Sequence, residues 1–311
     1  MYLTLIWSIV ILSTASCAVV PSSVRLVVNS WAEKKHGEPE VVVQVNNSTI
    51  PGPGGEIPLR IYTPEGSGPF PILVYFHGGG WVMGNLKTCN NTCHFLSHKI
   101  GCIVISVDYR LAPKHKFPAA VEDAYAATKW AAGHAAEING DSSRIAVAGE
   151  SAGGNLAAVV CLMAQDRGGP PLVFQLLAYP STNLATLETD SYRAFAKGYG
   201  LTKFHAKWFL KQYFADEKDR KNPYASPLLA ENLSNLPPAL VLTGEYDILR
   251  DDGESYVERL KEAGVEARFI RYGAKGHMAH WKKPSGEAGE SQYQAALALQ
   301  AVFQSDAPRS P

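Results

Sequence analysis

Hydrophobic residues gather in short apolar runs that alternate with longer amphipathic stretches from about residue 55 onward. The runs are often β-branched, which is typical of strands buried on both faces of a mainly parallel sheet. We predict strands over 71–76, 102–107, 144–148, 239–243 and 267–272, and helices over 119–136, 151–165, 253–263 and 285–303. Strands that alternate with helices in this way indicate an α/β layered fold.

Two segments do not fit this alternation, and we interpret both as a cap. Residues 21–50 precede the core strands, and residues about 183–220 contain an aromatic, amphipathic stretch at 204–214. Aromatic residues at helical spacing usually pack in a core, and an insertion after a strand would cover the edge where strands end. The main domain is then expected over 51–305, followed by a disordered tail over 306–311.

The first residues have the composition of an export signal. Residues 1–24 carry no charged side chain, and their apolar core at 3–12 is too short to span a bilayer. We expect residues 1–20 to be a cleaved signal peptide and the protein to be secreted or otherwise exported, with no stable membrane span afterwards. A retained N-terminal anchor and lipidation of Cys17 are the alternatives.

Composition excludes some classes of protein. The 29 basic and 29 acidic residues balance, and hydrophobic residues make up 46% of the chain. Disordered chains are poorer in apolar residues, and nucleic-acid-binding proteins usually carry a basic excess. We therefore expect no nucleic-acid partner, and an uncharged small-molecule substrate is compatible with the neutral balance. Asn-x-Ser/Thr sites mark an exported chain as a glycoprotein in a eukaryotic host, and they begin at Asn46, Asn47, Asn90 and Asn232.

The strongest chemical signal is the sequence Gly149-Glu150-Ser151-Ala152-Gly153, which lies between a predicted strand and a predicted helix. This is the context of a nucleophile elbow, a tight turn that exposes a serine at the edge of a sheet. Small neighbours let the backbone close, and the helix N-terminus favours developing negative charge. We predict Ser151 as a catalytic nucleophile.

A second motif, His77-Gly78-Gly79-Gly80-Trp81, follows another predicted strand. Consecutive glycines let backbone N–H groups point at a substrate oxygen without interference from side chains. We predict an oxyanion hole built from Gly78, Gly79, Gly80 and Ala152. The donors are expected to be the amides of Gly79, Gly80 and Ala152, while Gly78 keeps the shape of the loop and His77 and Trp81 support it.

A nucleophilic serine needs a base to take its proton and an acid to hold that base. In this architecture the chain order is Ser, then Asp or Glu, then His. Asp247 follows the strand at 239–243 and fits the acid, whereas Asp251 and Asp252 are better placed as first-turn residues of a helix. His277 follows the last predicted strand and fits the base, with His280 as the alternative.

These motifs together resemble the hormone-sensitive-lipase family of α/β hydrolases. The segments Tyr109-Arg110-Leu111-Ala112-Pro113, Phe117-Pro118-Ala119-Ala120 and Glu245-Tyr246-Asp247 are also similar to that family. The resemblance implies an eight-stranded, mostly parallel sheet with helices on both faces and a helical cap. It also implies a catalytic domain that hydrolyses esters with short or medium acyl chains, with Ser151, Asp247 and His277 as the triad and without a metal or organic cofactor.

The chain departs from the family pattern at four positions. Glu150 replaces the usual Asp or Thr, Lys114 replaces Glu, and Ile248 replaces Pro. Met278 follows the predicted base where the family usually has a small residue.

Several alternatives stay open at this level. An amidase, a deacetylase or a lipase would use the same triad, because contacts with the cap decide the substrate. A non-catalytic ligand receptor on a hydrolase fold, as in plant gibberellin receptors, would lack the triad His. A metal site is a weaker alternative. Zinc sites draw on at least two segments, whereas these ligands lie within ten residues and would share a single helix: Cys89, Cys93, His94 and His98. The sequence also leaves a homo-oligomer open.

Overall fold

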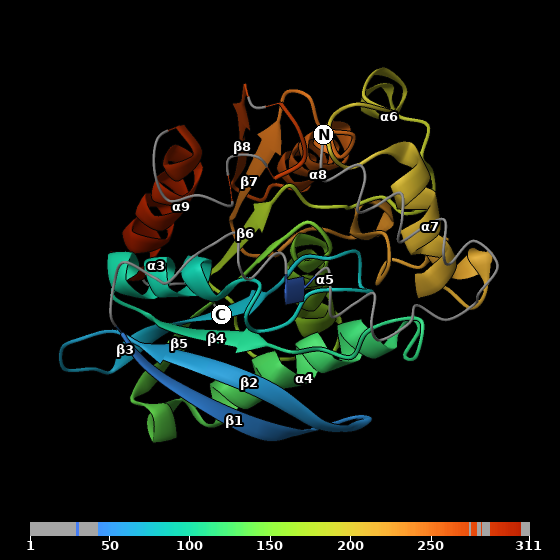
Figure 1. Cartoon of the computed structure of the whole chain (residues 1–311). Helices are drawn as coiled ribbons and strands as arrows, with labels where there is room; N and C mark the ends of the chain where they lie inside the picture. Colours follow the sequence, from blue (N-terminus) through green and yellow to red (C-terminus); the bar gives the residue numbers. More distant parts are fainter. Residues whose placement is uncertain (1–28, 31–42, 274, 279–280, 282–286, 306–311) are drawn as a thin grey trace.

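The computed structural model of the chain describes residues 29–30, 43–273, 275–278, 281 and 287–305 (Figure 1). The expected signal peptide over 1–20, the tail over 306–311 and His280 lie outside the described residues. Of the expected N-terminal cap segment, only residues 29–30 and 43–50 are described.

The centre of the molecule is an eight-stranded sheet with the strand order β1-β2-β4-β3-β5-β6-β7-β8. The first two pairs in this order are antiparallel and the others are parallel. This confirms the predicted eight-stranded, mostly parallel sheet. The strands are β1 (Gln44–Gly52), β2 (Gly55–Thr63), β3 (Phe70–Phe76), β4 (Ile103–Val107), β5 (Gly140–Glu150), β6 (Phe174–Ala178), β7 (Ala239–Gly244) and β8 (Ala267–Tyr272).

Helices cover both faces of this sheet. On one face α3 (Asn90–Ile100) packs beside α9 (Glu287–Gln304). On the other face lie α4 (Ala119–Gly133), α5 (Ala152–Asp166) and α8 (Arg250–Glu262) (Figure 1). No helix in the described part of the chain combines the length and the apolar composition needed to cross a membrane.

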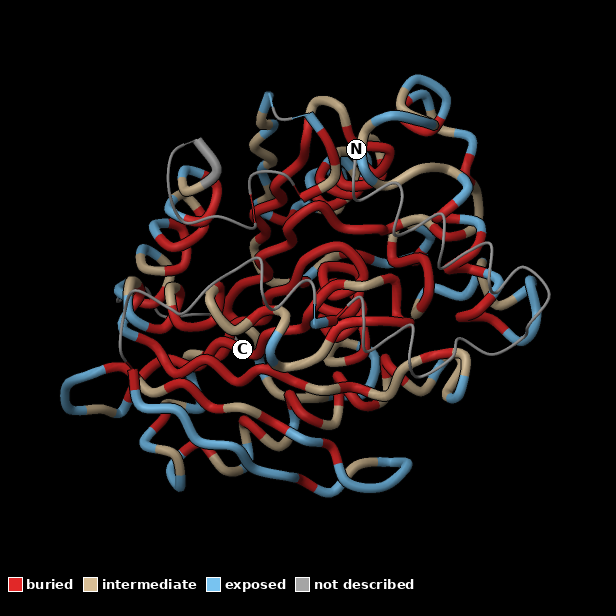
Figure 2. Tube along the Cα trace, viewed as in Figure 1, coloured by how far each residue is buried: buried red, intermediate tan, exposed pale blue. Residues whose placement is uncertain are grey.

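Strand β3 shows how the alternation of side chains supplies both faces. Ile72, Val74 and Phe76 join the hydrophobic cluster under α4, α5 and α8, whereas Leu73 and Tyr75 join the cluster under α3 and α9. Side chains along a strand point alternately to opposite faces, so a strand between two helical layers must be apolar throughout. Figure 2 shows the result, with buried residues concentrated along the sheet and the inner sides of its helices.

All five predicted strands are present, but β1, β2 and β6 were not predicted. β1 is exposed over most of its length, so it lacks the alternation that marks a half-buried strand. β6 is a five-residue apolar run after a Gly- and Pro-rich turn, and that run was the signal that could have found it. The expected boundary at residue 50 is also wrong, because residues 44–50 belong to this edge strand of the sheet rather than to a cap.

Residues 183–220, which we call the cap segment, form short helices away from the sheet. They comprise α6 (Asp190–Ala194), α7 (Lys203–Tyr213) and most of the 3₁₀ helix η2 (Glu217–Lys221). Helix α7 starts at a capping box, in which the Thr202 hydroxyl accepts a hydrogen bond from the His205 N–H and the His205 ring accepts one from the Thr202 N–H. Its aromatic face, with Trp208, Phe209 and Tyr213, is buried against the body of the protein.

Candidate active site

Ser151 lies in the turn between β5 and α5, where the sequence predicted a nucleophile elbow. Its φ of 56° and ψ of −116° place a non-glycine residue in a conformation that costs energy, and strain of this kind is common at functional sites. Side chains at the two flanking glycines would clash, because a Cβ on Gly149 would overlap the Gly153 backbone and one on Gly153 would overlap the Phe76 carbonyl. The Ser151 N–H donates to the Ala178 carbonyl at 2.8 Å, which fixes the turn to β6.

The structure brings Ser151, His277 and Asp247 together from three separate parts of the chain. Ser151 Oγ lies 2.9 Å from His277 Nε2, and His277 Nδ1 lies 2.7 Å from Asp247 Oδ2. Each residue follows the carboxyl end of a parallel strand, β5, β8 and β7 respectively, and these ends meet at one edge of the sheet. The three side chains therefore form a continuous hydrogen-bonded chain.

The Asp247 carboxylate is held by a backbone amide as well as by the imidazole. It is 1% exposed, and its second oxygen, Oδ1, accepts a hydrogen bond from the Leu249 N–H at 3.0 Å. The two alternative acids lie in the first turn of α8. There Asp251 accepts from the Ser191 N–H at 2.7 Å, while burial raises the pKa of Asp252 well above its usual range.

The glycine loop after β3 has a backbone that side chains would not tolerate. Gly79 has a φ of 123° and Gly80 a φ of 61°. A Cβ on Gly79 would overlap the Met83 carbonyl. The Met83 N–H donates a hydrogen bond to the Gly79 carbonyl at 3.0 Å. A Cβ on Gly80 would overlap the ring of Phe209 on α7. The glycine loop is thus packed closely between the backbone of Met83 and helix α7.

Gly78 belongs to the predicted oxyanion hole as the residue that keeps the loop's shape, and its amide is hydrogen-bonded within the protein. It donates to Oε1 of Glu150 at 3.0 Å, so it is not free to bind a substrate oxygen. Oε2 of the same carboxylate accepts a hydrogen bond from the Tyr75 hydroxyl, which in turn accepts one from Trp281 Nε1 at 3.0 Å. Glu150, the residue before Ser151, therefore links the Ser151 turn to the glycine loop, a contact that the sequence analysis missed.

His77, at the start of the glycine loop, is enclosed by the protein and contacts Tyr109. It is fully buried, its ring stacks on Tyr109 at 4.3 Å between centroids, and the Tyr109 hydroxyl donates to the His77 carbonyl at 2.7 Å. Burial lowers the pKa of the imidazole to about 4, so His77 is neutral at pH 7. Trp81, at the end of the His77–Trp81 motif, stacks on Tyr213 of α7, with ring centroids 4.5 Å apart and planes 6° apart.

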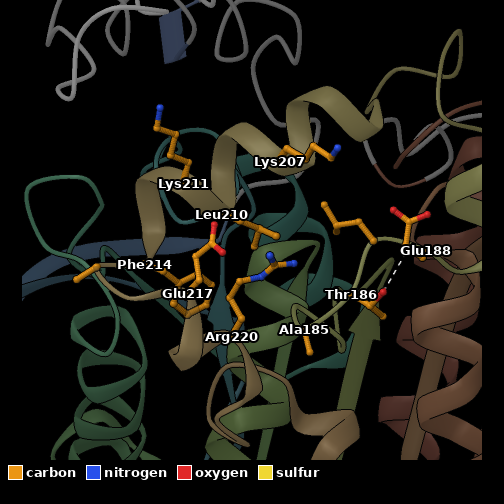
Figure 3. A pocket seen from close by; sticks show the side chains of 11 residues that line it. Ala185, Thr186, Glu188, Lys207, Leu210, Lys211, Phe214, Glu217 and Arg220 are labelled. Atoms are coloured by element: carbon orange, nitrogen blue, oxygen red, sulfur yellow. Dashed lines mark hydrogen bonds between the residues drawn. The ribbon is translucent and has the colours of Figure 1, made fainter.

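A cavity of about 620 Å³ lies within the cap segment, lined by residues of 185–188, α7 and 214–220 (Figure 3). Apolar side chains from Leu187, Leu210 and Phe214 line it together with charged ones, among them Lys207, Lys211, Glu188, Glu217 and Arg220. Ser151, His277 and Asp247 are not among its lining residues, so the hydrogen-bonded chain lies outside this cavity.

Metal-binding residue types do not gather into a cluster of three or more within the residues that the structure describes. Of the four residues considered as zinc ligands, Cys89 and Cys93 are buried, and the Cys89 thiol lies 3.2 Å from the Ser106 hydroxyl. Cys93, His94 and His98 all lie on α3, and Cys89 is its N-cap residue.

Comparisons with known proteins match this chain to α/β hydrolases and esterases. A family described by the alpha/beta hydrolase fold matches residues 73–281. The carboxylic ester hydrolase LipN of Mycobacterium tuberculosis is 49% identical over 240 residues, which are 75% of this chain but 64% of LipN. The arylesterase of Saccharolobus solfataricus is 44% identical over 223 residues, or 71% of this chain and 72% of that enzyme.

Solved structures agree. The esterase of Pyrobaculum calidifontis has a TM-score of 0.84 and 44% identity, with 89% of this chain and 92% of that chain covered. The carboxylesterase EstE1 from a metagenomic library has a TM-score of 0.88 and 39% identity, with 93% and 100% covered.

Proposed function

The chain belongs to the hormone-sensitive-lipase-like family of α/β hydrolases, and from that membership we propose that it is a serine carboxylic ester hydrolase. The observation that carries the proposal is the hydrogen-bonded chain from Ser151 through His277 to Asp247, with the serine on a strained elbow. The relatives' printed names, carboxylic ester hydrolase and arylesterase, support the same reaction class.

The proposed reaction has two steps. Ser151 Oγ attacks the ester carbonyl carbon while His277 Nε2 takes the serine proton, and Asp247 stabilises the imidazolium that forms. The tetrahedral intermediate places its negative oxygen at the amides of Gly79, Gly80 and Ala152. When it collapses, the C–O bond to the alcohol breaks and the alcohol leaves with the proton from His277.

Water then attacks the acyl-serine and gives a proton to His277. Collapse of the second intermediate breaks the bond to Ser151 Oγ, which recovers its proton as the carboxylic acid leaves. The residues of this cycle supply nucleophile, base, charge stabilisation and oxyanion donors, so the proposed reaction needs no cofactor. Neutral esters with short or medium acyl chains are the proposed substrates.

A panel of p-nitrophenyl esters from acetate to palmitate, with matched amides, tests this function. We expect hydrolysis of the short esters, and a fall in kcat of about 10⁴- to 10⁶-fold in Ser151→Ala. Ser143→Ala is the matched control, because Ser143 is exposed near the start of β5, at the opposite end of that strand from Ser151. Hydrolysis that survives Ser151→Ala would contradict the mechanism, and faster cleavage of amides than of esters would contradict the substrate class.

We propose in addition that residues 1–20 direct export and are then removed. Their uncharged, apolar composition supports this. The N-terminal sequence of the exported protein should begin near residue 21, and Ile6→Arg should keep the protein inside the cell. An exported protein that still begins at Met1 would contradict removal.

A further inference from the structure

A glycine-flanked turn in the cap segment reaches the candidate triad. Gly198 and Gly200 have φ values of 89° and 86°, a region that residues with a side chain rarely adopt. They flank Tyr199, which is half-buried in the connection between α6 and α7. The connection closes on itself through a hydrogen bond of 3.1 Å from the Lys203 N–H to the Ala196 carbonyl.

The backbone of Tyr199 contacts the loop of the proposed base. The His277 N–H donates to the Tyr199 carbonyl at 3.1 Å. Gly276 makes this approach possible, since it has a φ of 120° and a Cβ there would lie 3.0 Å from the Tyr199 carbonyl oxygen. A side chain at position 276 would therefore crowd the hydrogen bond that holds the histidine backbone.

The ring of Tyr199 contacts the loop of the proposed acid. It stacks on Tyr246, the neighbour of Asp247, with centroids 5.5 Å apart and planes 13° apart. Phe195 packs edge-on against both rings, at 5.4 Å from Tyr199 and 5.7 Å from Tyr246. Aromatic pairs of this geometry contribute specific stabilisation beyond the area they bury.

The same turn is fixed to helix α7. His205, in the first turn of α7, is hydrogen-bonded to the Gly200 backbone as well as to Thr202. Further along the same helix, Phe209 packs on Gly80 of the oxyanion loop. Helix α7 is thus connected to both sides of the candidate site.

We propose that Tyr199 is a positioning residue for the triad. Its carbonyl holds the His277 loop and its ring holds the Asp247 loop, so a single residue of the cap segment sets the two loops relative to each other. The inference rests on the proposed function for its catalytic consequence, but the contact itself is independent of substrate.

The test measures catalysis and backbone protection on the same variants. In Tyr199→Ala we expect kcat for a short p-nitrophenyl ester to fall about ten- to hundredfold with KM within about twofold, because misplaced groups slow the chemical step. The His277 amide should exchange hydrogen at least about tenfold faster, since its acceptor is no longer held. Tyr199→Phe keeps the stacking ring and should behave as wild type in both measurements.

Tyr293→Ala is the matched control, because Tyr293 is 40% exposed on α9 and packs against Lys99. Tyr199→Leu keeps apolar bulk without a flat ring and serves if the alanine variant does not fold; it should also lower kcat. Wild-type kcat and wild-type His277 exchange in Tyr199→Ala would overturn the proposal, as would a change in KM alone. If wild type hydrolyses no ester, the proposed function fails, and the exchange rates still decide whether Tyr199 holds the loop.

Discussion

Replacement of Glu150 by alanine should weaken both the fold and the reaction. The carboxylate is 6% exposed and accepts hydrogen bonds from the Gly78 N–H, at 3.0 Å, and from the Tyr75 hydroxyl. Alanine would leave both donors buried without an acceptor. Trp281 Nε1 would still donate to the Tyr75 hydroxyl at 3.0 Å, but that hydroxyl would have nowhere to place its own proton.

The magnitude follows from these contacts. A hydrogen bond to a charged acceptor contributes about 1.5–3 kcal/mol, so two contribute about 3–6 kcal/mol. Removal of the buried carboxylate also removes the desolvation penalty of its burial, which offsets part of the lost stabilisation. We expect the free energy of unfolding to fall by about 2–4 kcal/mol. Loss of one oxyanion donor lowers kcat by about 10²–10³, so a loosened but intact loop should lower it about 10- to 100-fold.

Urea denaturation and steady-state kinetics on a short p-nitrophenyl ester measure the two effects. Glu150→Gln keeps an oxygen for the Gly78 N–H, but its amide would donate to a Tyr75 hydroxyl that already accepts from Trp281. The glutamine variant should therefore keep most of kcat and lose stability. Glu258→Ala, on the exposed side of α8, is the control. A Glu150→Ala enzyme with kcat within about twofold of wild type would refute the reasoning.

Two further predictions concern the backbone and the buried imidazole. Gly153→Ala should lower the free energy of unfolding by at least about 2 kcal/mol in urea denaturation, because its Cβ would overlap the Phe76 carbonyl, and an unchanged urea midpoint would contradict this. His77 has a folded-state pKa of about 4 against an ordinary 6.5, so the unfolded chain binds the extra proton between these values. From pH 6.5 to 4, wild type should therefore lose about 3 kcal/mol more stability than His77→Gln. The comparison with the variant isolates His77, because Asp108, whose pKa is raised to about 6, acts in the opposite direction in both proteins.

The sequence predicts the elements of the site that depend on local signals. The two glycine motifs each follow an apolar run, and the candidate acid and base each follow another, so parallel pairing alone brings them to one edge. The same reasoning selects Asp247 over its neighbours in α8. Strand β1 escaped prediction because an exposed edge strand needs no apolar alternation.

Contacts between distant residues have no such local signal. The bond from Trp281 to Tyr75 joins residues 206 apart in the chain, and the bond from Gly78 to Glu150 joins residues 72 apart. The sequence could identify Gly78 as part of a glycine loop, but only the fold decides whether its amide faces a substrate or a carboxylate. Glu150 was noticed as a departure from the family pattern, and the structure gives that departure a partner.

Two residues, Glu150 and Tyr199, hold different parts of the candidate site in place. Glu150, on the sheet, fixes the oxyanion loop to the nucleophile turn, and neither partner lies in the cap segment. Tyr199, in the cap segment, links the loops of His277 and Asp247. Since α7 also packs on Gly80, a shift of the cap segment would disturb the base and the oxyanion donors while leaving the nucleophile turn intact. The cap segment would then affect whether the proposed triad is assembled.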